Sequence, residues 1–295
     1  MEEITGAADG LEQASESDWN EAVHEARKSL KKGRALLRLA RAAMGPLYGE
    51  ANVLLRDVGR SLSEVRDAEV MVATIDKFAE VGPKPAIGEL VEPVRRVLVE
   101  RRDRVIDQAK AEGVPERAAK RIRHAGALLT KVSWERADRE VIETGLKREY
   151  GRGRSAFEAA RRNPEGDATH EWRKRVKDHW YHLRLVRKGW SPVLKRTAKA
   201  AHTVSDLLGD EHDLAVLMDE LHANEGDLWN PAWADSISTL AERKRGELFA
   251  EAVPLGRRVY AERPTRFAAR IHRYWKATDS EIRLQGDLQT RAAGA

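Results

Sequence analysis

The stretch VHEARKSLKKGRALLRLAR, residues 23–41, places a histidine at the head of a series of basic side chains. Seven Lys and Arg residues follow His24 against a single acid, so this is not the mixed-charge surface of an ordinary solvated helix. A second stretch, THEWRKRVKDHWYHLRLVR, residues 169–187, repeats the pattern behind His170. Apolar residues recur at helical spacing in both stretches and along nearly the whole chain, without an alternating strand pattern of useful length. The sequence therefore predicts an all-α protein.

An internal repeat relates the two stretches. One ungapped shift of 146 residues superimposes them and continues into a second pair of segments, LSEVRDAEVMV (62–72) and LGDEHDLAVLM (208–218). The matched residues are His24 with His170, Arg27 with Arg173, Lys28 with Lys174, Lys31 with Lys177, Arg66 with His212, Asp67 with Asp213 and, at a shift of 142, Glu100, Arg101 and Arg102 with Glu242, Arg243 and Lys244. We therefore expect two copies of one helical unit, residues 18–135 and 138–278, each large enough for a four-helix bundle.

Glycine and proline clusters divide the chain into eight or nine expected helices. The acidic residues 1–17 are expected to form a disordered leader, and residues 279–295 a C-terminal tail. Gly59 and Gly209 would each permit a bend in a long helix or simply close packing. The helices are expected over residues 18–44, 48–80, 89–112, 116–132, 137–162, 168–189, 192–223, 231–252 and 264–277, with breaks at 45–46, 81–88, 113–115, 163–167, 189–192 and 230–231.

The charge of the chain is unevenly distributed. The formal net charge is +5, but residues 1–18 hold six acids and no base, so the remainder carries 53 bases against 42 acids. A basic surplus of this size attracts polyanions such as nucleic acid, anionic membranes or phosphate polymers, without choosing among them. The chain has no cysteine, which excludes disulfides and thiolate metal sites, and no apolar run approaches the roughly 18 residues of a membrane span. These features predict a cytoplasmic protein.

The basic residues of each stretch lie along one edge of their helix, because positions three, four and seven apart share a face. Like charges at these spacings repel by about 0.2–0.5 kcal/mol per pair, so a repeated arrangement indicates that an anion normally neutralises them. A single basic helix is usually a solvated face, but repetition at a fixed shift argues against that interpretation. The candidate ligands are His24, Arg27, Lys28, Lys31 and Arg38 in the first copy and His170, Arg173, Lys174, Lys177, Tyr181 and Arg184 in the second.

The second repeated segment adds four candidates. Arg66 and His212 are expected to belong to the binding surface. Asp67 and Asp213 each precede an apolar run, so they are expected to be structural, as an ion pair or a cap that fixes a basic neighbour. Trp172, Trp180 and Tyr181 occur in the second copy alone and are expected to pack between helices.

Two other kinds of site compete with anion binding. Glu21 with His24, and Asp167 with His170, have spacings that resemble dinuclear metal sites in helical bundles, but the cations beside each histidine oppose a divalent metal. Nucleic acid would also engage Lys and Arg, although no recognition module accompanies them. No phosphate loop, nucleophile triad or zinc spacing occurs, so we expect neither an enzyme nor a cofactor.

On these paired segments the sequence resembles the CHAD domain, the conserved-histidine α-helical domain family, over residues 18–278. The resemblance implies two four-helix bundles related by a pseudo-twofold, a basic cleft or pore between them, and binding of inorganic polyphosphate, often at polyphosphate granules. Granule proteins or a separate polyphosphate-metabolising enzyme are the implied partners. The ligands that the resemblance implies are His24, Arg27, Lys28, Lys31 and Arg34 in the first copy, with His170, Arg173, Lys174 and Lys177 in the second. Trp180 stands in the place of Arg34, and Asp178 in the place of Lys32.

The histidines should make binding depend on pH. Neighbouring cations are expected to lower the pKa of His24 and His170, and a bound polyanion to restore it. Binding would then take up protons, and affinity would rise as the pH falls from about 8 to about 6.

Overall fold

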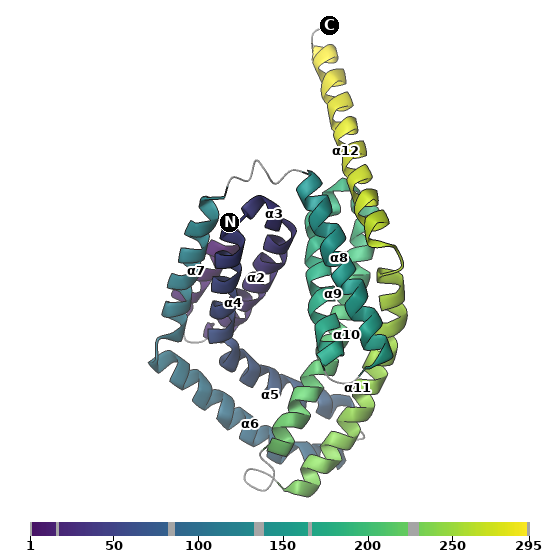
Figure 1. Cartoon of the computed structure of the whole chain (residues 1–295). Helices are drawn as coiled ribbons and strands as arrows, with labels where there is room; N and C mark the ends of the chain where they lie inside the picture. The colour runs from purple at the N-terminus through teal and green to yellow at the C-terminus, as the bar shows by residue number, and fades with distance from the viewer. Residues whose placement is uncertain are drawn as a thin grey trace. The chain divides into compact units, whose positions relative to one another are not determined.

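The computed structural model describes residues 2–15, 18–81, 86–132, 139–164, 167–223 and 230–293. Within these ranges the protein consists of α-helices and a short 3₁₀ helix, without a β-strand, which confirms the predicted all-α class (Figure 1). None of the described helices combines the length and the apolar character that a membrane crossing requires. The elements are α1 (Glu2–Gln13), α2 (Trp19–Leu39), α3 (Arg41–Met44), α4 (Leu47–Ser61), α5 (Ser63–Val81), α6 (Ala86–Ala111), α7 (Val114–Thr130), α8 (Arg139–Arg162), α9 (Asp167–Val186), η2 (Arg187–Gly189), α10 (Ser191–Ala223), α11 (Pro231–Val259) and α12 (Pro264–Ala293).

The glycine and proline clusters separate helices where the sequence predicts breaks. Gly45 has φ +54°, a left-handed conformation that costs glycine little because it lacks a Cβ atom. Gly113, with φ +62°, precedes α7 in the same way, and Pro115 lies in the first turn of that helix. Proline suits this position because the first turn leaves its amide nitrogens without helical partners.

The prediction of a disordered acidic leader is wrong, because residues 2–13 form α1 and pack against α7. The buried residues of α1 are Ile4, Ala7, Ala8 and Leu11. Their spacing is that of an amphipathic helix. The acids lie on the outer side, where Glu3 pairs with Lys32 of α2 and Glu12 with Arg123 of α7. The hydrogen bond from Arg123 lowers the pKa of Glu12.

A predicted long helix breaks at Leu62, between α4 and α5, whereas α10 runs unbroken through the equivalent Leu208. Side-chain donors at the break compete with the helical hydrogen bonds. The carbonyl oxygen of Gly59 accepts hydrogen bonds from the hydroxyl of Ser63 (3.2 Å) and from the guanidinium of Arg27 (2.5 Å). The second copy has a glycine in place of Ser63 and therefore lacks this hydroxyl donor.

Three further helix ends differ from the prediction. The first basic helix, α2, ends at Leu39 and is followed by the short α3. α11 continues through Pro254, at the loss of one helical hydrogen bond, to Val259. α12 extends to Ala293, so most of the predicted C-terminal tail, from residue 279 onward, is helical.

The chain divides into two compact units, which do not follow the two sequence repeats. Unit 1 comprises residues 1–34, 46–132 and 207–251, and unit 2 comprises residues 35–45, 133–206 and 252–295. The prediction of one bundle per repeat is therefore not confirmed. α10 has 33 residues and α11 has 29. At 1.5 Å per residue these helices are about 50 and 44 Å long, more than one small bundle needs, and each contributes residues to both units.

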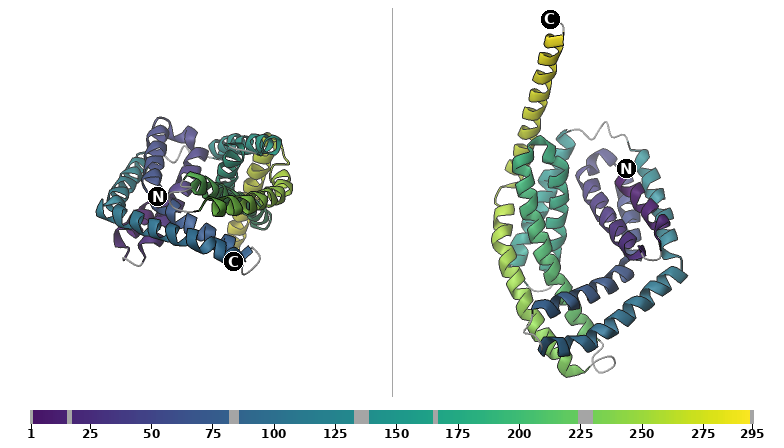
Figure 2. Two further views of the ribbon diagram at one scale, coloured as in Figure 1. Left: turned by 90° about the horizontal axis from the view of Figure 1, so that it is seen from below. Right: turned by 180° about the vertical axis from the view of Figure 1, so that it is seen from behind.

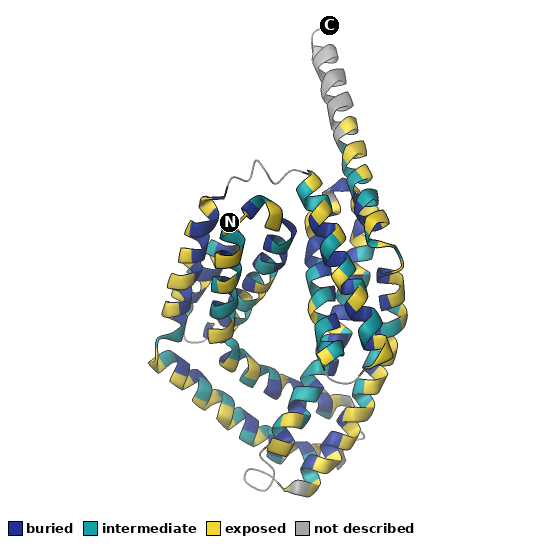
Figure 3. Ribbon diagram, in the orientation of Figure 1, coloured by how far each residue is buried: buried dark blue, intermediate teal, exposed yellow. Residues whose placement is uncertain are grey.

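Unit 1 has a core to which both repeats contribute. α5 and α6 lie side by side, and the last part of α10 and the first part of α11 pack against them (Figures 1 and 2). The most deeply buried side chains of this cluster include Ile75, Val94, Leu98, Leu217, Leu221 and Ile237. Figure 3 shows buried and exposed residues alternating around α5 and α6, as expected of amphipathic helices that share one core.

Unit 2 has an aromatic core, formed where α8 packs against α9 and α12. The rings of Tyr150 and Phe267 are stacked with centroids 4.2 Å apart, and His179 meets Tyr150 edge-on at 5.2 Å. Trp172 is fully buried beside Phe157, which agrees with the expectation that it packs between helices. Aromatic pairs of this kind add about 0.5–1.5 kcal/mol each beyond the area that they bury.

Candidate functional site

The edge of α2 that faces solvent is shorter than the sequence predicts. Lys28 and Lys31 are exposed, and the side chain of His24 is 37% exposed. The ammonium of Lys28 lies 2.8 Å from the carboxylate of Glu25, one turn earlier on the same helix, and both side chains are 48% exposed. An exposed pair of this kind is worth about 0.3–0.5 kcal/mol, so an incoming anion can replace the carboxylate at small cost.

Arg27 lies on the inner side of α2, with a side chain that is 12% exposed. Its guanidinium donates to the carbonyl oxygen of Gly59 and to the hydroxyl of Ser63 (2.6 Å), and it lies 3.7 Å from Asp67. Burial lowers the pKa of the Arg27 guanidinium, and the charge of Asp67 opposes that effect. Arg27 therefore holds α2 against the α4–α5 break, and Asp67 makes the kind of ion pair that the sequence led us to expect of it.

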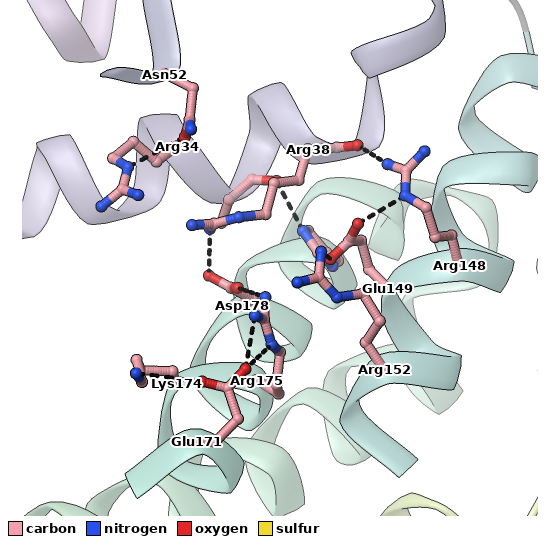
Figure 4. A network of polar contacts seen from close by, with 12 residues as sticks. Arg34, Arg38, Asn52, Arg148, Glu149, Arg152, Glu171, Lys174, Arg175 and Asp178 are labelled. Atoms are coloured by element: carbon pink, nitrogen blue, oxygen red, sulfur yellow. Dashed lines mark hydrogen bonds and ion pairs between the residues drawn. The ribbon is translucent and has the colours of Figure 1, made fainter. Parts of the chain in front are cut away.

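The remaining basic residues of α2 also have partners. Arg34 donates from Nε to the side-chain oxygen of Asn52 (3.2 Å). Arg38 pairs with Asp178 of α9 at 2.9 Å, and both side chains are largely buried (Figure 4). Asp178, the acid that replaces a lysine in the second copy, also lies 3.6 Å from Arg175. The prediction that Arg38 belongs to the binding edge is thus wrong, because its guanidinium forms an ion pair with this largely buried acid.

α9 presents the same exposed pair as α2. The ammonium of Lys174 lies 3.2 Å from the carboxylate of Glu171, with side chains 52% and 40% exposed (Figure 4). Glu171 also accepts from Arg175 at 2.6 Å, and despite its partial burial these cations lower its pKa. His170, Arg173 and Lys177 are partly exposed. The exposed edge of α9 therefore contains a histidine, an acid–lysine pair and two further cations.

Two other candidates on α9 have different outcomes. Tyr181 is 3% exposed, and its ring packs 4.6 Å from that of Trp180. Tyr181 is therefore not on the exposed edge, and its burial agrees with the competing expectation that it belongs to the core. Arg184 is exposed, and its guanidinium lies 5.2 Å from the ring centroid of Trp180, a cation–π contact that leaves its charge accessible.

The two leading histidines are less basic than a free histidine. Burial is the largest cause of the lowered pKa of His24, followed by the positive charge of Arg66. For His170, burial again comes first, followed by the charges of Lys174 and Arg173. The direction agrees with the sequence prediction, but desolvation contributes more than the neighbouring cations, which the sequence alone does not reveal.

Both copies of the second repeated segment contribute residues to a pocket. Arg66 pairs with Glu69 at 3.1 Å, and both Arg66 and Asp213 line a cavity of about 500 Å³ between α5, α10 and α11. His212 is partly exposed on α10. Within unit 1 the structure therefore brings Arg66 close to His24, whereas Asp213 lies at the pocket with other partners.

Sequence reasoning missed several residues. Glu25 and Glu171 are related by the same 146-residue shift as the histidines, so the repeat itself carried a usable signal for them. His179 and His182 are buried on α9, and burial lowers their pKa to about 3 and about 4. No pattern of neighbouring charges marks these two histidines, so their burial is visible in the tertiary structure alone.

Metal binding gains no support from the described residues, among which no three or more His, Asp or Glu side chains gather as a metal site requires. Neither Glu21 with His24 nor Asp167 with His170 is completed by further carboxylates there.

Comparison with known proteins gives one positive result. A model of the CHAD domain family matches residues 3–222, about three quarters of the chain. The match begins within α1 and ends near the last residue of α10. No curated protein matches the chain significantly.

Proposed function

Because the chain belongs to the CHAD domain family, we propose that it binds inorganic polyphosphate without catalysing its turnover. The observation that carries the proposal is the repeated exposed arrangement on two helices. His24, Glu25 and Lys28 on α2 match His170, Glu171 and Lys174 on α9, including the ion pair within each set. Two surfaces related by one sequence shift indicate that a shared ligand, rather than local stability, maintains the pattern.

The chemistry of these edges suits a flexible polyanion. A helix rises about 5.4 Å per turn, so cations three or four residues apart form a ladder for a chain that is charged at every phosphoryl unit. Lys28, Lys31, Lys174 and Lys177 supply mobile point charges, and Arg173 can bind two phosphate oxygens with one guanidinium. The carboxylates of Glu25 and Glu171 hold the lysines in place until phosphate displaces them.

The finer features that the family resemblance implies also belong to the proposal. They are a pseudo-twofold pair of four-helix bundles, a basic cleft shared by the two copies, cytoplasmic attachment at polyphosphate granules, and partners among granule proteins or a separate polyphosphate-metabolising enzyme. The proposed ligands are His24, Lys28, Lys31, Arg66, His170, Arg173, Lys174, Lys177, Arg184 and His212. A fluorescent fusion that stays diffuse in granule-containing cells would contradict the granule attachment.

The decisive test reverses one exposed charge on each edge. The Lys28→Glu, Lys174→Glu variant should bind long-chain polyphosphate at least about a hundredfold more weakly, because each reversal removes a phosphate contact and adds a repulsion. Helicity should be unchanged, because both lysines are exposed and weakly paired. Polyphosphate binding is measured by titration at fixed salt, with circular dichroism as the check on folding.

A matched control carries the same change in net charge elsewhere. Lys120→Glu with Lys199→Glu alters exposed lysines on α7 and α10, outside the two edges, and should keep most of the affinity. Equal loss in both variants would mean that net charge alone drives binding. Duplex DNA of matched charge and orthophosphate serve as competitors, and equal competition by DNA would favour a nucleic-acid-binding protein instead.

A further inference from the structure

The pocket in unit 1 has the size and lining of a small-molecule site. Its volume of about 500 Å³ falls within the roughly 300–1,000 Å³ of known ligand sites. Apolar atoms form most of the pocket surface, and one of the apolar lining residues, Leu240, is 41% exposed. The apolar lining comprises Val70, Ala73, Phe78, Leu214, Leu240 and Leu248. Charged residues of α5, α10 and α11 complete the lining.

The internal repeat explains how the pocket arises. In one half of the unit 1 core, Arg101 of α6 forms an ion pair with Glu220 of α10. In the sequence repeat, Arg243 of α11 is equivalent to Arg101, at the 142-residue shift. Thr74 of α5 is equivalent to Glu220, at the 146-residue shift. Both Thr74 and Arg243 line the pocket. A threonine thus replaces the acid that joins the two helices in the other half, and the shorter side chain leaves an opening.

Arg243 and its neighbour Lys244 carry surplus positive charge at this opening. They share one acid of their own helix, Glu247, at 3.4 and 3.3 Å, and the side chain of Arg243 is 81% exposed. Elsewhere in the lining, Lys77 is matched by Asp210 at 2.6 Å. The charged lining residues are Arg66, Lys77, Arg243 and Lys244 against Asp210, Asp213 and Glu247. Arg66 pairs with Glu69 outside the lining, so the surplus of one positive charge lies at Arg243 and Lys244, which share Glu247. That balance suits a ligand with one acidic group, not a polymer.

We propose that this pocket binds a small organic anion with an apolar body. Its acidic group takes the place that the carboxylate of Glu220 fills in the other half, beside Arg243 and Lys244. Its body covers Phe78, Leu214 and Leu240, and removes their apolar surface from water. The inference does not rest on polyphosphate binding, because Arg66 alone is shared between the pocket lining and the proposed polyphosphate ligands, and the contacts to the small anion come from Arg243 and Lys244.

An aromatic sulfonate dye, anilinonaphthalene sulfonate, tests the site directly, because it combines an apolar body with one negative group. We expect saturable binding to the full-length protein, followed by dye fluorescence. Ala73→Trp fills the pocket from an exposed lining position and should weaken binding at least about tenfold. The matched control is Ala127→Trp, at an exposed position of α7 outside the pocket, which should bind the dye as the wild type does.

A second variant tests the missing acid. Thr74→Glu restores the residue of the other half, and its carboxylate should pair with Arg243 and exclude the dye. Equal dye binding by Ala73→Trp and Ala127→Trp would overturn the proposal, as would full dye binding by a folded Thr74→Glu variant. Polyphosphate affinity should be unchanged in Ala73→Trp, so a failure of this inference is distinguishable from a failure of the proposed function.

Discussion

α2 and α9 begin with the same pattern of residues but use it differently. Both expose a histidine followed by an acid–lysine pair, with nearly equal exposure of the two lysines. In α2 the following arginine, Arg27, is buried and hydrogen-bonded to Gly59 and Ser63. In α9 the inner side is aromatic, with Trp172 and His179 buried among other rings. The histidine, acid and lysine positions are therefore alike in the two helices, whereas the same arginine position is largely buried in α2, as Arg27, and partly exposed in α9, as Arg173.

The most informative difference lies at one pair of equivalent positions. Lys32 of α2 forms an exposed ion pair with Glu3, whereas Asp178 of α9 is largely buried and binds Arg38 and Arg175. The charge of Lys32 stabilises the fold little, because water competes for an exposed ion pair. The charge of Asp178 neutralises the buried guanidinium of Arg38. Three predictions test how far this contrast between the helices extends.

The largest effect is expected from removing the charge at these two positions. Asp178→Asn should lower the free energy of unfolding by about 3 kcal/mol, because Arg38 is left buried without its acid. Lys32→Met, the equivalent change on α2, should cost about 0.5 kcal/mol or less. Urea denaturation of both variants measures the difference. Similar small losses in the two variants would show that the Arg38–Asp178 pair is accessible to water in the folded protein.

A smaller effect is expected from the buried histidines of α9. His179 has a pKa of about 3, because burial and then the charges of His182 and Arg270 disfavour its protonation. The unfolded chain, with an ordinary histidine pKa near 6.5, takes up the proton first, so this contribution to stability is present above pH 6.5 and is lost as the pH falls towards 3. Between pH 7 and pH 5, the free energy of unfolding of His179→Phe should therefore fall by about 2 kcal/mol less than that of the wild type.

The comparison of wild type and His179→Phe isolates this histidine, because all carboxylates titrate alike in both. Urea unfolding at pH 7 and pH 5 supplies the two free energies for each protein. Identical pH dependence in the two proteins would mean that His179 is accessible to protons in the folded state.

The smallest effect concerns the exposed histidines, which α2 and α9 share. The lowered pKa of His24 and His170 leaves them neutral near pH 7 in the free protein. A bound polyanion should raise the pKa, so polyphosphate affinity should increase by about threefold per histidine as the pH falls from about 8 to about 6. His24→Gln with His170→Gln should flatten this profile. The control, His124→Gln with His222→Gln, changes two exposed histidines elsewhere and should keep the slope.

Some parts of the structure could be predicted because their cause is local. Proline and glycine at residues 45–46 and 113–115 end helices through backbone geometry, and the structure has breaks there. The amphipathic spacing of α1 can also be read from the sequence, but the acidic composition of residues 1–17 favoured the wrong prediction of disorder. The break at Leu62 was not predicted: one of the donors to the Gly59 carbonyl oxygen, Ser63, is local, but the other, Arg27, is 32 residues away from Gly59 in the sequence.

The sequence by itself determined the helical class, the internal repeat, the family and the repeated spacing of histidine and basic residues on α2 and α9, because periodicity and residue spacing act within one helix. The tertiary structure alone decided that Arg27 and Arg38 are buried against partners, that Tyr181 belongs to the core, and that Thr74 and Arg243 face one pocket. These outcomes depend on which helices pack together, and the burial of a charge or a ring is set by neighbours distant in the chain.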